Sequence, residues 1–276
     1  MIRWLALLAV PAVILSLPTP AGLTAEAWKL FAVYCAAILG LIIRPAVESI
    51  VLLAVVAMGS FILPVGKMLS GFGNSTVWMV FSAFLISQAF ADTGLGKRVA
   101  YIMIGRFGKS ALGLVYSAAL TDLLLSPATP SNTARSGGIV YPIFRNVAGA
   151  LGSEPGATGR KIGSFLTLSM YGISMTTSSL FITACAPNAL MVSFAKNILK
   201  VEVSWIQWAV ALFLPGILML AVVPYVIYKL YPPEMKAIDN AEEMSQNGLA
   251  ELGPVSVKEK LLMLFFGLAI VGWSTG

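Results

Sequence analysis

Long apolar runs separated by short polar segments dominate the chain from its beginning. A helix needs roughly 20 residues to cross a hydrocarbon core of about 30 Å, and the runs approach or exceed that length. Strand-like alternation of apolar and polar positions is absent, which favours helices over barrel strands. Proline residues end two of the runs. The pattern predicts spans at residues 4–17, 28–43, 47–63 and 76–91.

A polar interruption divides the next apolar region into two limbs. Residues 111–125 and 139–147 are apolar, and the motif PATPSNTARSGG lies between them. Each limb alone is too short to cross a bilayer comfortably. Irregular backbone at membrane depth is tolerated only where it is buried in protein or lines a wet cavity. We therefore expect a re-entrant hairpin over residues 110–147 with its tip beside a cavity.

A second interruption follows within residues 162–195, a run longer than one crossing needs. Its middle reads YGISMTTSS at residues 171–179, where a glycine and several hydroxyl side chains replace aliphatic residues. This composition predicts a helix that unwinds near the middle of the membrane. The alternative for each Ser or Thr is a hydrogen bond back to its own helix.

The end of the chain combines one more span with a polar linker. Residues 203–230 form a full apolar span, and residues 231–260 hold three prolines and several acidic residues, as a cytoplasmic linker with a surface helix would. Residues 261–276 begin another span. Because the chain stops within that run, we expect it to be part of a longer protein.

The overall composition matches this membrane class. Hydrophobic residues make up 58% of the chain and charged residues only 11%, whereas soluble domains carry roughly a quarter. The fold class we expect is therefore all-α and polytopic. The net charge of +6 comes from basic residues spread over short loops, which signals topology and not nucleic-acid binding.

The basic residues also predict the orientation in the bilayer. With the N-terminus in the cytoplasm, thirteen of the eighteen Lys and Arg residues fall on the inner side, four fall outside, and one lies at the hairpin tip. This bias places the N-terminus in the cytoplasm of a multi-pass inner (plasma) membrane protein. A cleaved secretory signal before residue 28 is the alternative, but the Pro-rich loop there favours a permanent turn.

The tip motif carries polar chemistry that suits a charged ligand. A half-helix that starts after Pro130 would present its N–H groups beside the Ser131 and Thr133 hydroxyls and the Asn132 amide, as a receptor for a carboxylate or phosphate. The tip also offers carbonyl oxygens and the Asn132 side-chain oxygen, which suit a dehydrated Na+ ion. These residues alone do not decide whether the ligand is an anion or a cation.

An arginine near the middle of a membrane is costly and normally faces a partner or a cavity. Arg135 could therefore pair with a substrate carboxylate or supply a fixed charge. The alternatives are that it snorkels to the cytoplasm or pairs with Asp122, which lies earlier in the same hairpin. For Asp122 itself we favour a structural ion pair over direct transport chemistry.

Cysteine and histidine usage narrows the function classes. The sequence has no His, and its only cysteines, Cys35 and Cys185, lie far apart in apolar runs, so we expect both to be packing residues. This excludes a disulfide framework and a Cys/His zinc site, and no cofactor is implied. A membrane enzyme would need convergent catalytic groups, which are missing. A carrier, a channel and an inactive fragment are the classes that stay open.

Four stretches carry a resemblance to a known family. SPATPSNTARSGGIVYPI closely resembles the first Ser-Asn-Thr hairpin of the divalent anion:sodium symporter family, in its branch of citrate/succinate, tartrate and 2-oxoglutarate/malate translocators. Supporting matches are GLTAEAWKLFAVYCAAILGLIIRP, FSAFLISQAFADTGLGKRVAY and MTTSSLFITACAPN. The resemblance implies two inverted repeats, of which this chain would hold the first and the start of the second.

The resemblance also implies a site and a mechanism. It implies scaffold helices over residues 1–109, a transport region over 110–200, and a homodimer with an elevator-type cycle that carries di- or tricarboxylates. It assigns carboxylate contact to the hairpin motif, with the break at 172–177 facing it. The candidate substrate-binding residues are Ser131, Asn132, Thr133, Arg135, Thr176, Thr177 and Ser178, and the candidate cation site is Ser131, Asn132 and Gly172.

Departures from the sodium-coupled pattern favour exchange over Na+ symport. Sodium-coupled members tend to have a Gly-rich break followed by Pro-Pro-Asn, whereas this chain has Met-Thr-Thr and then Ala-Pro-Asn. Pro127 also stands where sodium-coupled relatives can place a hydroxyl. With Arg135, these differences indicate an anion exchanger in which a fixed charge replaces bound sodium. Na+ stays the candidate coupling ion of the alternative, a sodium-coupled symporter.

Overall fold

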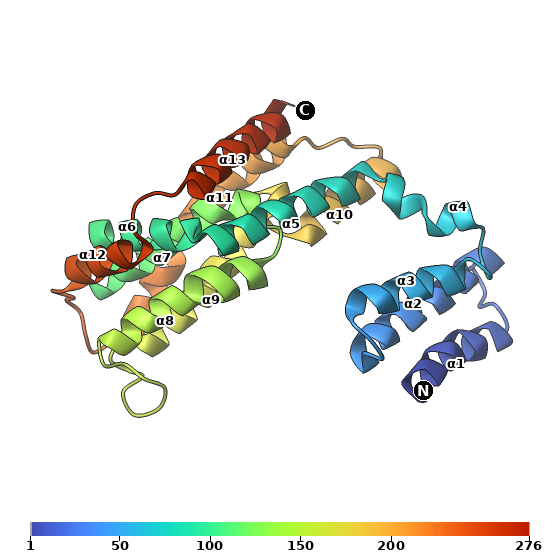
Figure 1. The fold of residues 1–276 in the computed structure, drawn as a ribbon, viewed down its shortest axis with the longest axis horizontal. Coiled ribbons are helices and arrows are strands. Elements are labelled where there is room, and N and C mark those ends of the chain that lie inside the picture. The colour runs from blue at the N-terminus through green and yellow to red at the C-terminus, as the bar shows by residue number, and fades with distance from the viewer. Residues whose placement is uncertain (1, 276) are drawn as a thin grey trace. The chain divides into compact units, whose positions relative to one another are not determined.

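The described residues, 2–275, fold into helices without a β-strand in the computed structural model (Figure 1). This confirms the expected all-α class. The chain divides into two compact units, one up to Val77 and one from Trp78 onward. Within this described part, three helical segments are long and apolar enough to cross a bilayer: Ala25–Ile43, Ala111–Ala128 and Trp205–Leu230.

The first unit packs three helices around close-fitting glycines. A Cβ added to Gly40 would lie only 2.5 Å from Val51 and 2.7 Å from Leu7, so glycine allows all three helices to approach there. The predicted third span is shorter than expected, because its helix ends at Gly59. The elements are α1 (Ile2–Ser16), α2 (Ala25–Ile43), α3 (Glu48–Gly59), the short α4 (Val65–Met68) and a 3-10 turn, η1 (Ser70–Gly73).

The second unit begins with a bent pair of helices. Helix α5 (Ser75–Thr93) matches the predicted fourth span, and α6 (Leu95–Phe107) leaves it at an angle of 66°. The bend lies at Gly94, whose φ of +77° is in the left-handed region that favours glycine. The sequence analysis did not predict α6 as a separate helix.

Helix α6 is held between the hairpin and the C-terminal elements. A Cβ on Gly96 would lie 2.7 Å from Ile139 of the hairpin, so the two helices touch there. On the other side, the buried Arg98 donates to the Glu259 carboxylate at 2.6 Å and to the Gly253 carbonyl at 3.0 Å. The predicted linker is thus tied to α6 by a buried ion pair.

The polar motif separates two helical limbs. The first limb is longer than predicted, because α7 and the turn after it form an 18-residue apolar segment. The second limb starts as a π-helix, a rare geometry that often marks functional positions. The limbs comprise α7 (Ala111–Leu125), the 3-10 turn η2 (Ser126–Ala128), the π-helix η3 (Thr133–Val140) and α8 (Tyr141–Ala150).

The predicted position of the second break is wrong. Helix α9 (Gly163–Leu180) runs without interruption through residues 171–179, and the chain leaves the helix at Phe181 instead. Hydroxyls of the Ser/Thr run bond back to carbonyls of their own helix, for example Thr176 to Gly172 at 2.9 Å, so they are compatible with helix. The break comprises the 3-10 turn η4 (Ile182–Ala184). Helix α10 (Ala186–Phe194) and the short π-helix η5 (Ala195–Leu199) follow.

The remaining elements complete the second unit. Helix α11 is the predicted full span and packs along α9, the largest helix–helix contact in this unit. The linker contains α12, whose Gly248 lets it press against the ring of Tyr101. These elements are α11 (Trp205–Leu230), α12 (Ala241–Leu252) and α13 (Val257–Thr275).

Candidate functional site

The two chain breaks lie side by side in the second unit. The backbone N–H of Ala186, at the start of α10, donates to the carbonyl of Pro130 at the hairpin tip, at 2.9 Å. These residues are far apart in the sequence but close in space. The hairpin tip and the gap between α9 and α10 therefore form one polar region inside the helical bundle.

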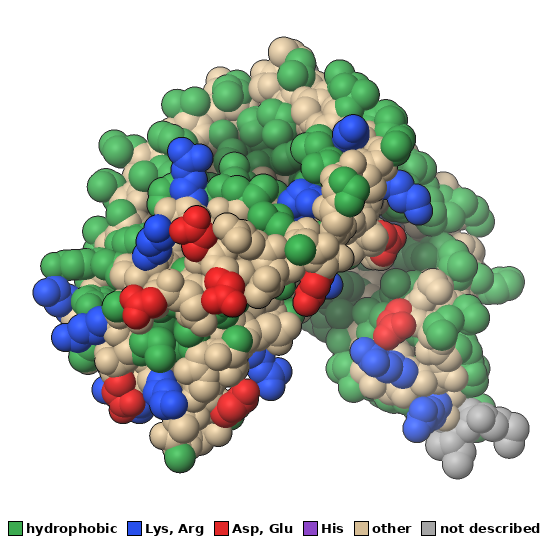
Figure 2. All heavy atoms as spheres, turned by 60° about the vertical axis from the view of Figure 1, so that its left-hand side comes forward, with side chains coloured by type: hydrophobic (Ala, Val, Ile, Leu, Met, Phe, Trp, Pro, Cys, Tyr) green, Lys and Arg blue, Asp and Glu red, His purple; other side chains and the backbone are tan. Residues whose placement is uncertain are grey.

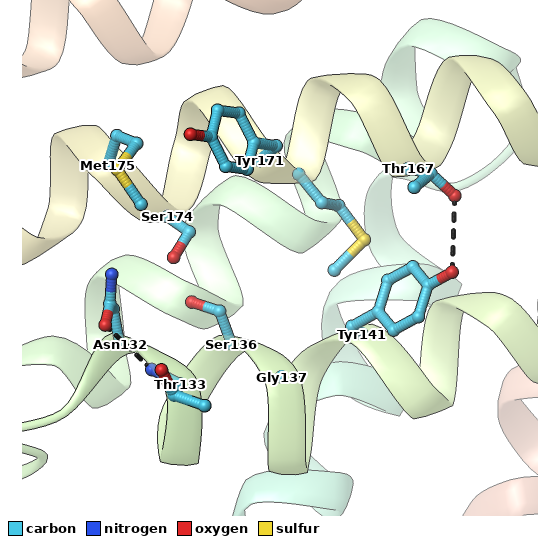
Figure 3. Close-up of a pocket in the computed structure, with 10 residues that line it drawn as sticks. Asn132, Thr133, Ser136, Gly137, Tyr141, Thr167, Tyr171, Ser174 and Met175 are labelled. Carbon is cyan, nitrogen blue, oxygen red and sulfur yellow. Dashed lines mark hydrogen bonds between the residues drawn. The ribbon is translucent and has the colours of Figure 1, made fainter. Parts of the chain in front are cut away.

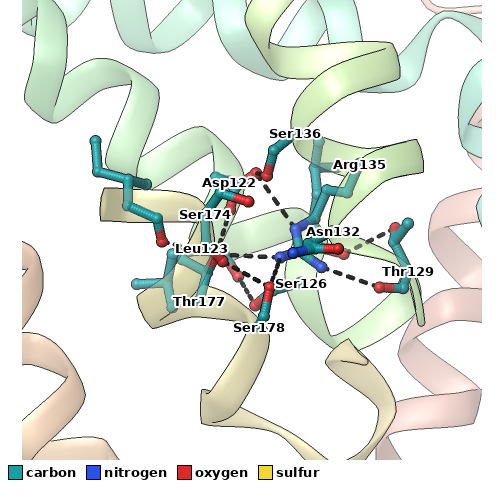
Figure 4. A network of polar contacts seen from close by, with 12 residues as sticks. Asp122, Leu123, Ser126, Thr129, Asn132, Arg135, Ser136, Ser174, Thr177 and Ser178 are labelled. Carbon is teal, nitrogen blue, oxygen red and sulfur yellow. Dashed lines mark hydrogen bonds and ion pairs between the residues drawn. The ribbon is translucent and has the colours of Figure 1, made fainter. Parts of the chain in front are cut away.

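Arg135 ties these breaks together from within. It is fully buried, and its guanidinium donates to the carbonyl of Thr129 at 3.0 Å and to that of Ala184 at 3.1 Å, one from each break. It also donates to the hydroxyls of Thr177 at 3.1 Å and Ser178 at 3.3 Å (Figure 4). A break in a helix leaves backbone carbonyls without their helical hydrogen-bond partners, and the guanidinium supplies donors to them here.

A buried carboxylate balances the charge of this arginine. Asp122 on α7 is 1% exposed, and its carboxylate lies 3.3 Å from Nε of Arg135. It also accepts hydrogen bonds from the hydroxyls of Ser136, at 2.6 Å, and Thr177. The predicted ion pair between Asp122 and Arg135 is present. Because each charge is paired and hydrogen-bonded, the cluster can be buried as a neutral unit.

Asn188 closes the end of α9. Its side-chain amide donates to the carbonyls of Ser178, at 2.7 Å, and Phe181, at 2.9 Å. The last carbonyls of a helix have no partner within the helix, so this amide substitutes for the missing turn. The sequence analysis used the Ala-Pro-Asn sequence that ends at Asn188 only as a departure from the sodium-coupled pattern and did not assign Asn188 to the site.

The hairpin tip caps its own helix with the side chains that the sequence singled out. Asn132 Oδ1 accepts from the N–H of Thr133 at 2.9 Å, and Ser131 Oγ accepts from the N–H of Ala134 at 3.3 Å. Among the described residues, no hydrogen bond engages the Asn132 amide nitrogen or the Thr133 hydroxyl. These two groups stay available to a ligand.

A cavity of about 310 Å³ opens beside Asn132, between the second limb of the hairpin and α9. Figure 3 shows the Asn132 amide nitrogen turned across it toward Ser174 and Met175. At the far end, the hydroxyls of Tyr141 and Thr167 lie 3.5 Å apart and close the groove. The cavity is lined by Asn132, Thr133, Ser136, Gly137, Tyr141, Thr167, Met170, Tyr171, Ser174 and Met175.

The structure brings only some of the predicted site residues to this cavity. Asn132 and Thr133 line it, and Ser131 is the neighbouring half-buried tip residue. The predicted Arg135, Thr177 and Ser178 lie in the buried network instead.

Two other predicted residues lie elsewhere on α9. Thr176 lines a separate cavity of about 300 Å³ between α9 and α11. Gly172, expected in a cation site, is in continuous helix, where a Cβ would lie 2.7 Å from Val223 of α11. Its local role is close helix packing.

The cavity wall contributed by α9 was not predicted as a site. Its members, Thr167, Met170, Tyr171, Ser174 and Met175, recur at helical spacing and form one stripe along α9. That periodicity is visible in the sequence. It identifies one face of the helix, but only the fold shows that this face meets the hairpin.

Hydroxyl and amide groups dominate the polar chemistry of the cavity, and no lining residue carries a charge. An anion bound there would be stabilised by hydrogen bonds and by the positive end of the helix that starts at the tip. Among the described residues, no cluster of three or more His, Cys, Asp or Glu side chains could hold a metal ion.

Comparison with known proteins gives a consistent family. Residues 1–276 match the family described as the sodium:sulfate symporter transmembrane region. The inner membrane protein YbhI of Escherichia coli K12 is 50% identical over 97% of this chain and 57% of its own length.

Two relatives have substrates in their names. Dicarboxylate transporter 1, chloroplastic, of Arabidopsis thaliana is 37% identical over 94% of this chain and 47% of its own length. The L-tartrate/succinate antiporter of Escherichia coli UTI89 is 34% identical over 99% of this chain and 61% of its own length. The chain thus spans about half to three fifths of the curated relatives it matches.

Proposed function

Because the chain belongs to the sodium:sulfate symporter transmembrane family, the divalent anion:sodium symporter family that its motifs resemble, we propose that it forms part of a secondary transporter of di- or tricarboxylates. The relatives described above are named as an inner membrane protein, a transporter and an antiporter, and none is named as an enzyme. The apolar helices place the protein in a membrane.

One observation carries this proposal. The Ser-Asn-Thr tip and the break after α9 are joined within the bundle, and a cavity opens beside Asn132 with its amide nitrogen unused. Irregular backbone of this kind is characteristic of substrate sites in transporters built from broken helices. In this proposal Asn132 and Thr133 contact a substrate carboxylate, and Ser131 holds the tip in shape.

The substrate class follows from the chemistry and the relatives together. Hydrogen-bond donors at a helix start suit carboxylates. Related proteins are named for dicarboxylates and for tartrate and succinate, which are small acids of this class. We assign the same class to this protein.

The buried arginine favours exchange over sodium symport. The guanidinium of Arg135 is surrounded by carbonyl and hydroxyl oxygens from both breaks and by the Asp122 carboxylate, the kind of oxygen cage that would suit a small cation. A side chain that already fills this cage leaves a bound Na+ ion without a role there. The proposal is therefore anion exchange, with Na+-coupled symport as the alternative.

The wider mechanism belongs to the same proposal. We assign the protein an elevator-type cycle, a homodimeric state and an inner-membrane location with a cytoplasmic N-terminus. The transport region would comprise residues 110–200, carrying the hairpin and the break, and residues 1–109 would act as scaffold.

Counterflow in proteoliposomes tests the function. Vesicles that hold the intact protein and unlabelled dicarboxylate should take up labelled succinate in Na+-free buffer, with saturation, and empty-lumen vesicles should not. Uptake that strictly requires Na+ would overturn exchange in favour of symport. Ohmic conductance without counterflow would overturn the carrier itself.

A further inference from the structure

Two serines face each other across the cavity next to Asn132. Ser136 comes from the π-helix η3 and Ser174 from α9, and both line the cavity although each is only 8% exposed. Figure 3 shows their hydroxyls turned toward one another from the two walls. A ligand held by Asn132 would place its adjoining carbon atoms between them.

The hydrogen-bond states of these two hydroxyls differ. Ser136 donates its proton to the Asp122 carboxylate at 2.6 Å, so its oxygen can only accept a bond from a ligand. Ionised Asp122 can only accept, which fixes this direction. Within the described part of the chain, the Ser174 hydroxyl makes no hydrogen bond, so it is free to donate.

An acceptor on one wall, Ser136, opposite a donor on the other, Ser174, best matches a hydroxyl substituent on the ligand. An alcohol donates through its proton and accepts through its oxygen, so it can satisfy both serines. A ketone oxygen can only accept and would use Ser174 alone. A methylene group uses neither and leaves the Ser174 hydroxyl without a partner and the Ser136 oxygen without a donor, which is unfavourable in a buried site.

We infer that Ser136 and Ser174 form a specificity subsite for the hydroxyl group of 2-hydroxy dicarboxylates. The buried ion pair sets this preference, because Asp122 orients the Ser136 proton away from the cavity. The inference rests on the proposed carboxylate transport and adds which member of the class is favoured. The sequence analysis did not single out either serine as a ligand contact.

Three four-carbon acids that differ at one position test the subsite. Malate, oxaloacetate and succinate carry a hydroxyl, a ketone and a methylene there. Each should inhibit counterflow of labelled succinate by the intact protein, with malate binding tightest, oxaloacetate next and succinate weakest. One hydrogen bond corresponds to roughly a threefold to tenfold step in inhibition constant.

Serine-to-alanine variants assign the preference to the residues. Ser174→Ala should reduce the preference for malate and for oxaloacetate over succinate roughly threefold to tenfold. Ser136→Ala should weaken malate alone. Ser179→Ala is the matched control on the same helix, because its hydroxyl bonds back to the carbonyl of Thr176 at 2.8 Å; it should leave the order unchanged.

The outcomes distinguish a failure of the subsite from a failure of the proposed function. If all three acids drive counterflow with equal inhibition constants, or if oxaloacetate still inhibits more strongly than succinate in Ser174→Ala, the subsite is refuted and carboxylate transport stands. If no acid drives counterflow, the proposed function fails. Because the Ser174 hydroxyl holds no other group in place, Ser174→Ala is expected to fold and gives a clear reading even if Ser136→Ala does not.

Discussion

At the scale of single residues, Arg135 and Asn132 have different roles, although the sequence analysis assigned both to substrate binding. Arg135 is fully buried and holds the two breaks in contact, whereas Asn132 keeps an amide nitrogen free beside the cavity. A buried charge is tolerated only with full pairing. Arg135 is therefore expected to act on stability first, and Asn132 on ligand binding.

Asn132→Ala should abolish carboxylate counterflow while the protein still inserts and folds. The substitution removes the available amide donor at the tip, and the other hydrogen bond of this side chain is a local cap that accepts from the N–H of Thr133. Counterflow and thermal unfolding in detergent measure the two effects. Asn197→Ala serves as control, because that side chain is exposed and its amide donates to the Ser193 hydroxyl one helical turn away. Unchanged transport by Asn132→Ala would remove this residue from the site.

Arg135→Gln and Asp122→Asn should each destabilise the protein by about 3–5 kcal/mol, because either change leaves a buried charge without its partner. The double variant should recover much of that loss. Thermal unfolding of all four proteins in detergent forms a double-mutant cycle.

The cycle also tests the alternative role of Arg135. Strictly additive losses would contradict the ion pair as the source of stability. If Arg135→Gln instead unfolds like the unmodified protein but binds dicarboxylate more weakly, the arginine contacts substrate directly.

At the scale of elements, the sequence predicted which kinds of element occur better than it predicted where each one begins and ends. The hairpin, its polar tip and a second break follow from interrupted hydrophobicity, which is a local signal. The break was misplaced because hydroxyl groups in a helix bond to their own carbonyls, and Asn188, which caps the real helix end, acts across the gap. Composition alone does not separate these two arrangements.

Contacts between elements could not be read from the sequence. The separate helix α6 depends on one left-handed glycine, Gly94, and on Arg98 reaching Glu259 more than a hundred positions away. The α9 wall of the cavity shows helical spacing, but its facing partner is set by packing. The ion pair between Asp122 and Arg135 was foreseen because both lie in one hairpin.

The packing of α9 on α11 gives a prediction at this scale. A Cβ added at Gly216 of α11 would lie 2.0 Å from Leu180, so Gly216→Ala should force the helices apart and destabilise the protein by about 1–3 kcal/mol. Gly267→Ala on α13 is the matched control, because it meets no atom within 4 Å and gains helix propensity. Equal unfolding temperatures for both variants would contradict this packing.

At the scale of the whole molecule, charge is distributed as in a membrane protein. Figure 2 shows Lys and Arg mixed with Asp and Glu over part of one face and hydrophobic side chains over much of the rest. Basic residues bias loops toward the cytoplasm, so we expect the linker with α12 on that side.

Labelling of single cysteines checks this orientation. In a variant whose native Cys35 and Cys185 are replaced by serine, Lys67→Cys should react with a membrane-impermeant maleimide added to intact cells. Lys258→Cys should react only after the membrane is opened. The reverse pattern would invert the topology.

The central claim is that the joined breaks form the carboxylate site. A structure of the intact protein in a lipid nanodisc with bound dicarboxylate tests it most directly. The account predicts a substrate carboxylate within hydrogen-bond distance of Asn132, in the cavity between the hairpin and α9. A ligand held elsewhere, or an Asn132 loop exposed at the water surface away from any cavity, would contradict it.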